Sequence, residues 1–318
     1  IVIMLALFGA TIAWPFVTGS RHLASSGKSD EESGVPPDDG DELPAVYTSD
    51  EHFEELSDPR PGSWRDRFDE PVRDYNEWLH DRPAPPDDER HVLYLQPIGE
   101  FDSSAAPDLD VLSEGVSRYL GMEVRTRPPL EFDALDVRTR ENPHHGQTQW
   151  LTTDVLEELK SRKSDDAYAV LAITMTDVWP GRGWNYVFGQ ASLEENVGVQ
   201  SFARYDPESR LSHPIRDRHL TREQTMLLRS LEIVVHEFGH TFGIHHCRHY
   251  RCVMNGSNSL RETDRAPLRI CPVDLRKLQH AVGFDPIRRY RRLAEFYRTH
   301  GLLSESQFAA ARALLDSE

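Results

Sequence analysis

The stretch "HEFGHTFGIHHC", residues 236–247, decides how this chain is interpreted, because it places four histidines, one glutamate and one cysteine within twelve residues. It ends a segment with the pattern of a helix. Thr221 begins a capping box, and Gly243 fits the left-handed position that often follows a helix. His236 and His240 are four residues apart, so their side chains lie about 40° apart around the helix axis. Both imidazoles can therefore reach one metal ion.

The neighbouring residues complete the pattern of a catalytic zinc site. Glu237 projects beside the histidine pair, near enough to hydrogen-bond an ion-bound water without being a ligand. A positive φ at Gly243 allows a sharp turn, and His246 then returns to the same point. Three neutral nitrogens and one open position are what a catalytic zinc needs, in the pattern HExxHxxGxxH. The alternative is a group of solvated histidines at a helix end. His245, out of register by one residue, is assigned to the surface or to the surroundings of the ligands.

Three cysteines follow the histidines within 25 residues. They are Cys247, Cys252 and Cys271, and an odd number cannot be fully paired within one chain. Their clustering favours metal ligation over disulfides. Four other histidines are assigned no functional role: His144, His145, His213 and His219.

Length and charge limit the class of protein. The chain has 318 residues, of which 38% are hydrophobic, and a formal net charge of −17. Residues 28–90 contain 21 Asp or Glu against 7 Lys or Arg, so a net charge of −14 lies in this one segment. An acidic protein gains nothing from phosphate backbones, so nucleic acid is excluded as the expected partner.

The N-terminal part divides into two segments before the domain. Residues 1–20 are uncharged and are expected to form a signal or membrane-anchor segment, with a buried apolar strand as the alternative. Residues 21–60 are rich in Gly, Ser, Pro and acids, and are expected to be a disordered linker. Residues 61–318 then form the domain. The expected protein is membrane-anchored or exported, and the alternative is cytoplasmic.

Strands and helices alternate first, and helices dominate later, which predicts an α/β or α+β class. Residues 185–192 and 196–205 are expected to form a hairpin. Residues 167–179 are expected to form one long central strand. Thr152 is expected to be the N-cap of the helix at 152–160. The remaining strands are expected at 91–99 and 122–126, and the remaining helices at 109–120, 152–160, 274–282, 285–299 and 304–316.

The segment "HEFGHTFGIHHCRHYRCVMNGSNSLRETDRAPLRICPVDLRKL", residues 236–278, resembles the archaemetzincins, a metzincin family of zinc metallopeptidases. The similarity covers roughly residues 60–300. It implies a metzincin-like fold of the α+β class (mixed α/β). In this fold a twisted mixed sheet lies above an active-site helix, and a helical C-terminal subdomain lies below. Residues 189–205 would supply the edge strand over the cleft, with which an extended peptide could pair. Met254 would lie in the turn beneath the metal.

The chain departs from the family pattern at the fourth cysteine. In the family, four thiolates hold a second, structural zinc, whereas Asp274 stands here at the last of the four positions. An Asp oxygen can ligate zinc, but Asp274 is also a natural N-cap for the helix after it. Both interpretations stay open, and His249 and His280 are weaker candidates for the missing ligand. Cys247, Cys252, Cys271 and Asp274 are thus the expected second set.

The function expected is zinc-dependent hydrolysis of peptide bonds, with Glu237 as the general base and a peptide or protein as substrate. The expected protein is a monomer with a catalytic zinc and a second structural zinc. A zinc-binding scaffold with weak or no turnover is the alternative, and a hydrolase of non-peptide acyl groups is a third. Arg204 and Tyr205 lie near the expected edge strand and are assigned no catalytic role.

Overall fold

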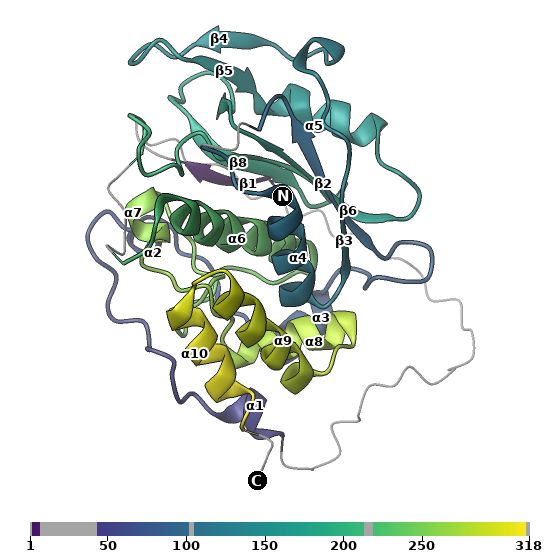
Figure 1. Ribbon diagram of the computed structural model, residues 1–318, viewed down its shortest axis with the longest axis vertical. Coiled ribbons are helices and arrows are strands. Elements are labelled where there is room, and N and C mark those ends of the chain that lie inside the picture. The colour runs from purple at the N-terminus through teal and green to yellow at the C-terminus, as the bar shows by residue number, and fades with distance from the viewer. Residues whose placement is uncertain (1, 7–42, 102–104, 213–218, 316–318) are drawn as a thin grey trace.

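The computed structural model describes residues 2–6, 43–101, 105–212 and 219–315, so the predictions for most of residues 1–42 and for His213 fall outside it. A mixed sheet forms the upper part of the molecule, helix α6 (Arg222–Thr241) lies beneath it, and further helices form the lower part (Figure 1). This is the mixed α/β architecture that the sequence predicts.

The sheet mixes parallel and antiparallel pairs in the order β3-β2-β6-β9-β8-β7-β5-β4, with β1 pairing β8 outside this path. Strands β3, β2, β6 and β9 run parallel, whereas β8 is antiparallel to β9. The strands are β1 (Val2–Ala6), β2 (Val92–Ile98), β3 (Glu123–Thr126), β4 (Thr139–Glu141), β5 (Thr148–Leu151), β6 (Ala167–Thr174), β7 (Asp177–Trp179), β8 (Val187–Ser192) and β9 (Val197–Ser201).

Alternating side chains of the central strands fill two separate cores. In β2, Leu93 and Leu95 belong to the core shared with α6, whereas Val92 and Tyr94 belong to the core on the other face. This two-residue period is the geometry of a strand. The second core is closed by α5 (Thr152–Ser161), and the first by α4 (Leu109–Leu120) together with α6. Both faces of the sheet are therefore covered, as parallel strands require.

The lower part holds the C-terminal helices. They are α8 (Pro272–Val282), α9 (Pro286–Thr299) and α10 (Leu303–Arg312), whereas the short helix α7 (Leu260–Thr263) lies beside α6 (Figure 1). Helices α9 and α10 pack on each other, and Tyr290, Leu293 and Phe308 join the same core as α6. The predicted C-terminal helical patterns are confirmed, with α8 beginning at Pro272 rather than at residue 274.

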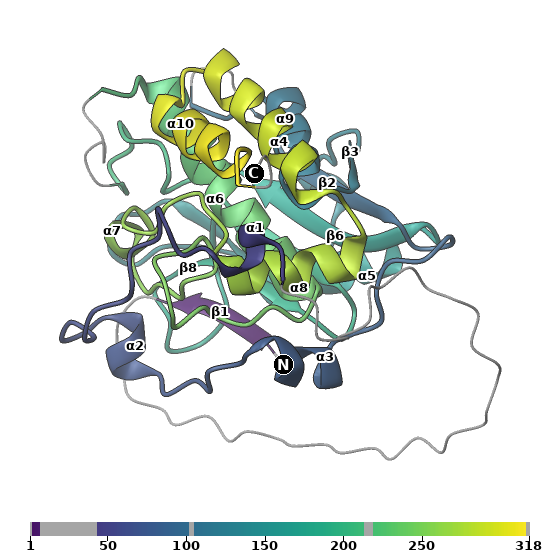
Figure 2. The ribbon, with the colours of Figure 1, turned by 90° about the horizontal axis from the view of Figure 1, so that it is seen from below.

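The chain ahead of β2 packs across this lower part. It contains the short helices α1 (Ala45–Thr48), α2 (Trp64–Arg67) and α3 (Tyr75–Asp81). A short 3-10 helix at Phe132–Ala134 comes later in the chain, after β3. Helix α1 lies against α8 (Figure 2). Val46 is buried, and its carbonyl accepts a hydrogen bond of 2.6 Å from Arg312. Residues from Ala45 onward thus pack on the domain, although they lie inside the range 21–60 that was expected to be a disordered linker.

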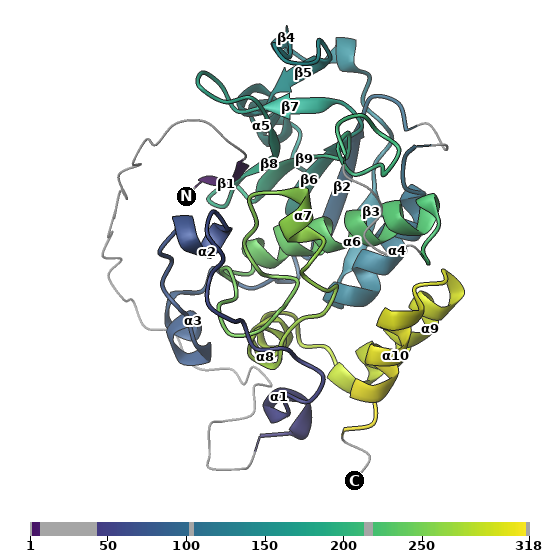
Figure 3. The ribbon, with the colours of Figure 1, turned by 90° about the vertical axis from the view of Figure 1, so that its left-hand side faces the viewer.

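The first strand, β1, adds to the sheet beside β8. Val2–Ala6 pairs antiparallel with β8, on the opposite side of β8 from β9. Figure 3 shows β1 on the same side of the molecule as α2 and α3. A strand here matches the alternative given for residues 1–20, and the rest of that segment is outside the described residues. Within the described ranges, none of the helices has the length and apolarity needed to cross a bilayer.

Two local predictions were wrong. The single strand expected at 167–179 is two strands, because the chain bends at Met175 and Thr176 between β6 and β7. Thr152 does not cap α5. It is the first helical residue, and its hydroxyl hydrogen-bonds Gln190 of the neighbouring strand instead. A buried partner in the sheet has replaced the local capping bond.

Candidate active site and metal clusters

Helix α6 carries the central residues because both of its ends are well defined. The Thr221 side chain accepts from the Gln224 N–H, and Gln224 in turn accepts from the Thr221 N–H, which completes the predicted capping box. Gly243 has φ +73°, as predicted. Between them the helix from Thr225 to Thr241 is buried. A helix that is buried on all sides needs cover on all sides, and α6 has it because it lies between the sheet and the lower helices.

The last turn of α6 passes close to the loop that holds Met254. A Cβ atom on Gly239 would lie 2.6 Å from the Met254 sulfur, so only glycine permits this approach. Met254 is buried, 1% exposed. The side chain thus lies against the helix that carries His236 and His240, as the family resemblance implies.

The structure brings the three predicted histidine ligands together. One ring nitrogen from each of His236, His240 and His246 lies within 4.8 Å of the other two. The Nε2 atoms of His236 and His240 are 3.0 Å apart, and all three side chains are buried. The turn at Gly243 is fixed by Trp78, whose indole N–H donates to the Phe242 carbonyl at 2.9 Å. His246 is thereby returned to the helix end.

The second nitrogen of each ring determines the tautomer. The Nδ1 of His236 is 2.8 Å from the Val253 carbonyl, and that of His240 is 2.7 Å from the Ile244 carbonyl. The Nδ1 of His246 is 2.9 Å from both carboxylate oxygens of Glu70. Carbonyl and carboxylate oxygens only accept, so each Nδ1 donates. In a neutral ring whose Nδ1 donates, Nε2 keeps its lone pair, and this is the form that binds metal.

The arrangement of these lone pairs fits a shared cation. Lone pairs of His236 and His240 face each other at 3.0 Å and repel unless a cation attracts both. The buried Nε2 of His246 makes no hydrogen bond to the residues that the structure describes. Burial lowers the pKa of His236 to about 3 and that of His240 well below its usual value, so both rings are neutral. Neutral nitrogen donors in this number suit zinc.

Glu237 lies beside the histidines on the side of the sheet. It borders a small hollow with Phe238 and Thr241 of α6 and residues of β6, β8 and β9. Burial raises its pKa to about 8, because the charged carboxylate is disfavoured away from water. A neighbouring cation acts in the opposite direction and favours the carboxylate.

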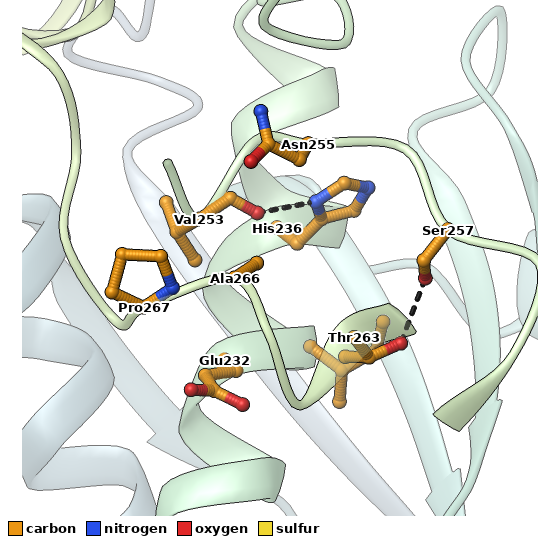
Figure 4. A pocket seen from close by; sticks show the side chains of 9 residues that line it. Glu232, His236, Val253, Asn255, Ser257, Thr263, Ala266 and Pro267 are labelled. Carbon is orange, nitrogen blue, oxygen red and sulfur yellow. Dashed lines mark hydrogen bonds between the residues drawn. The ribbon is translucent and has the colours of Figure 1, made fainter. Parts of the chain in front are cut away.

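A second hollow lies on the other side of His236. Figure 4 shows His236 above Glu232 of the preceding helical turn, with the loop from Val253 to Pro267 around them. The Ser257 and Thr263 hydroxyls are hydrogen-bonded at 2.7 Å within this loop. The Val253 N–H donates to the Arg269 carbonyl at 2.7 Å, and this bond holds the residue whose own carbonyl orients the His236 ring.

The cysteines form a second group with one carboxylate. One donor atom from each of Cys247, Cys252, Cys271 and Asp274 lies within 4.8 Å of the others, and all four residues are buried. The three cysteines are free thiols. The Sγ atoms of Cys247 and Cys271 are 3.7 Å apart, and Asp274 Oδ2 is 3.4 Å from the Cys271 sulfur. Four converging donors with no open side match the pattern of a structural zinc site.

Asp274 does not cap α8. Cys271 is the N-cap and Pro272 is the first helical residue, so Asp274 lies inside the first turn. Pro favours this first position because the helix needs no N–H there. The alternative assignment of Asp274 as N-cap was wrong. Its Oδ1 instead pairs with Lys277 Nζ at 2.9 Å in a buried contact.

The other candidates lie apart from the two clusters. His280 accepts or donates a hydrogen bond of 2.8 Å with the Tyr75 hydroxyl, and His249 contacts Tyr250. Neither belongs to a metal-binding group among the described residues. Arg204 is buried against Asp177, with Nε 2.9 Å from Oδ1, and His145 lies next to this pair. Arg204 therefore has a structural contact rather than a position beside His236.

Sequence reasoning missed two residues that contact His246. Glu70 accepts from its Nδ1, and the Trp64 ring meets the imidazole edge-on with 5.0 Å between centroids. Aromatic residues such as Trp64 and Phe68 follow residue 60 in the sequence, but they do not indicate a contact with His246. Residues 176 positions apart carry no common local pattern.

Comparisons with known proteins identify the relatives of this chain. Residues 147–280 match the model of peptidase family M54. The chain is 34% identical to mouse archaemetzincin-2 over 275 residues, covering 77% of this chain and 74% of the relative. It is 35% identical to human archaemetzincin-2, covering 74% and 72%. It is also similar to the crystal structure of an archaemetzincin from Methanopyrus kandleri, with 29% identity, 63% and 99% coverage and a TM-score of 0.45.

Proposed function

The chain belongs to the archaemetzincins, peptidase family M54, and is a zinc metallopeptidase. From this we propose which of its residues bind the zinc and which transfer protons during peptide hydrolysis. His236, His240 and His246 would hold the catalytic zinc. The observation that carries this assignment is that every Nδ1 is engaged by an acceptor, so every Nε2 is left for the ion. When bound, zinc would act as a Lewis acid toward water and the peptide carbonyl.

Glu237 is the proton acceptor and donor of the proposed mechanism. It directly follows a ligand on α6, yet it lies against the sheet rather than among the three imidazoles. Its carboxylate would take a proton from the attacking water and pass it to the leaving amine. A structural metal site needs no such group. Glu237 therefore favours an enzyme over a zinc-binding scaffold, the alternative function.

Strand β8 supplies the surface along which a peptide would lie. One side of β8 pairs with β9. The other side meets β7 at Val187 and pairs along the rest of its length with Val2–Ala6. This pairing supports strand addition at β8, because an extended segment already makes main-chain bonds there. An extended peptide in this register would take the place of Val2–Ala6, beside Ala191 and Ser192, which border the same hollow as Glu237. A peptide substrate is thereby favoured over a non-peptide acyl group.

The cysteine cluster would hold the second, structural zinc. Cys247 directly follows His246, so an ion held by Cys247, Cys252, Cys271 and Asp274 would fix the loop that presents the third histidine. Met254 N–H and Cys271 N–H approach the Cys252 sulfur at 3.5 and 3.3 Å, which stabilises a thiolate. Binding of this ion would contribute directly to folding stability.

Peptide libraries incubated with zinc-loaded protein and with Glu237→Gln test the function. We expect cleavage by the wild type and none by the variant, with equal zinc content in both. Zinc-loaded wild type that cleaves no peptide, while Glu237→Gln binds zinc equally well, would support the scaffold instead. Cleavage of acyl esters but not of peptides would support the third alternative.

A further inference from the structure

We infer that Glu70 is a positioning residue for the catalytic zinc, which it would influence through His246; this rests on the proposed function of the three histidines. Glu70 lies in the segment between α2 and α3, far outside the region 147–280 that matches the family model. Nothing in the zinc-binding motif itself specifies such a partner.

The contact is directed and partly protected from water. Both Glu70 oxygens are 2.9 Å from His246 Nδ1, the Glu70 side chain is 32% exposed and that of His246 is 5% exposed. The carboxylate meets the ring at the nitrogen opposite the coordinating one. It therefore leaves Nε2 free and does not compete with the metal for it.

The acceptor distinguishes His246 from the other two ligands. His236 and His240 donate to peptide carbonyls of Val253 and Ile244, whereas His246 donates to an anion. A carboxylate acceptor makes the imidazole a stronger electron donor and fixes its orientation more firmly than a neutral carbonyl. His246 is also the ligand that needs more support, because it lies in a loop rather than on α6.

The segment that carries Glu70 is itself held in place. The Trp64 indole donates to Glu70 Oε2 at 2.9 Å, and the Trp64 backbone N–H donates to Glu262 at 2.9 Å. A Cβ atom on Gly256 would lie 2.4 Å from the Trp64 ring, so glycine is needed where this ring packs on the loop after Met254. The Arg248 guanidinium donates to the Glu70 carbonyl. The carboxylate is thus oriented from several sides.

The test measures zinc affinity by competition with a chromophoric chelator, on the full chain stripped of metal and reloaded with zinc alone. Glu70→Ala should bind the catalytic zinc about 10–100-fold more weakly than wild type. Glu70→Gln should show a smaller loss, because an amide oxygen can still accept from Nδ1. Asp69→Asn is the matched control, since Asp69 is a neighbouring, fully exposed carboxylate whose contact with Arg248 at 3.3 Å is screened by water, and it should bind zinc like the wild type.

Two further readouts separate positioning from a general effect on the fold. Thermal unfolding of the metal-free variants should match the metal-free wild type. The visible absorption bands of the Co²⁺-substituted enzyme should shift in Glu70→Ala and not in Asp69→Asn, because only the former removes the hydrogen bond of a ligand, His246.

Two results would overturn the inference. One is wild-type zinc affinity in folded Glu70→Ala, and the other is a loss that Glu70→Gln does not reduce and that accompanies a lower melting temperature without metal. A protein that cleaves no peptide while showing the expected series of zinc affinities would refute the proposed function and leave the role of Glu70 intact.

Discussion

The histidine cluster and the cysteine cluster lie next to each other in the chain, yet they are built in different ways. His236, His240 and His246 come from eleven consecutive residues, and each offers one ring nitrogen. The cysteine cluster gathers Cys247, Cys252 and Cys271 from separate turns and adds a carboxylate, so its donors would be anionic once a metal binds. The comparison teaches that a short motif can define the catalytic cluster completely, whereas the second cluster depends on how the later chain folds.

The largest effect should come from removing a catalytic ligand. His236→Ala leaves two nitrogens, too few for a stable zinc site, so peptide cleavage should fall to background. Metal analysis should find one zinc per chain where the wild type has two, because the cysteine cluster is untouched. Loss of both ions would mean that the two clusters bind metal as one unit.

Removing the proton acceptor should come next. Glu237→Gln keeps all three histidines, so zinc content should stay at the wild-type value while kcat/KM falls about 10²–10⁴-fold. Steady-state kinetics on one cleaved peptide measures this. Retained activity in a fully metal-loaded variant would contradict the role given to Glu237, and with it the chemical distinction between the two clusters.

The cysteine cluster should respond in stability first. Asp274→Ala removes one donor and leaves the buried Lys277 without its carboxylate partner, a change that typically costs about 3–5 kcal/mol. Zinc per chain and the melting temperature should both fall. Asp274→Cys restores four thiolates and should bind the second ion more tightly than wild type.

Asp274→Ser supplies the control for this position. A serine can cap a helix but is a poor zinc ligand, and Cys271 is already the N-cap. We therefore expect Asp274→Ser to resemble Asp274→Ala. Zinc content and melting temperature equal to wild type would show that Asp274 is not a ligand.

The smallest effect should come from a residue in neither cluster. Thr221→Ala removes the cap at the far end of α6 and should lower the free energy of unfolding by about 0.5–2 kcal/mol. Chemical denaturation measures the loss. Both zinc ions and the peptidase activity below the unfolding transition should be unchanged, and a loss of zinc would show that the two ends of α6 are coupled.

The local parts of this molecule were predictable from sequence, and the long-range parts were not. Thr221, Gly243 and the histidine spacing predicted α6 and its turn, because caps and helical periodicity are properties of neighbouring residues. The N-cap assignment of Asp274 failed although Pro272 pointed to Cys271 as the cap. Glu70 was missed because no local pattern pairs it with His246.

The contact between Glu70 and His246 has a consequence for the time course of synthesis. It joins residues 176 positions apart, and Arg312 reaches the Val46 carbonyl across 266 positions. At about 5–20 residues per second, Glu70 emerges from the ribosome roughly 9 to 35 seconds before His246. The polypeptide can complete the surroundings of the catalytic zinc only after His246 has also emerged. A nascent chain that ends before His246 therefore lacks a finished peptidase site.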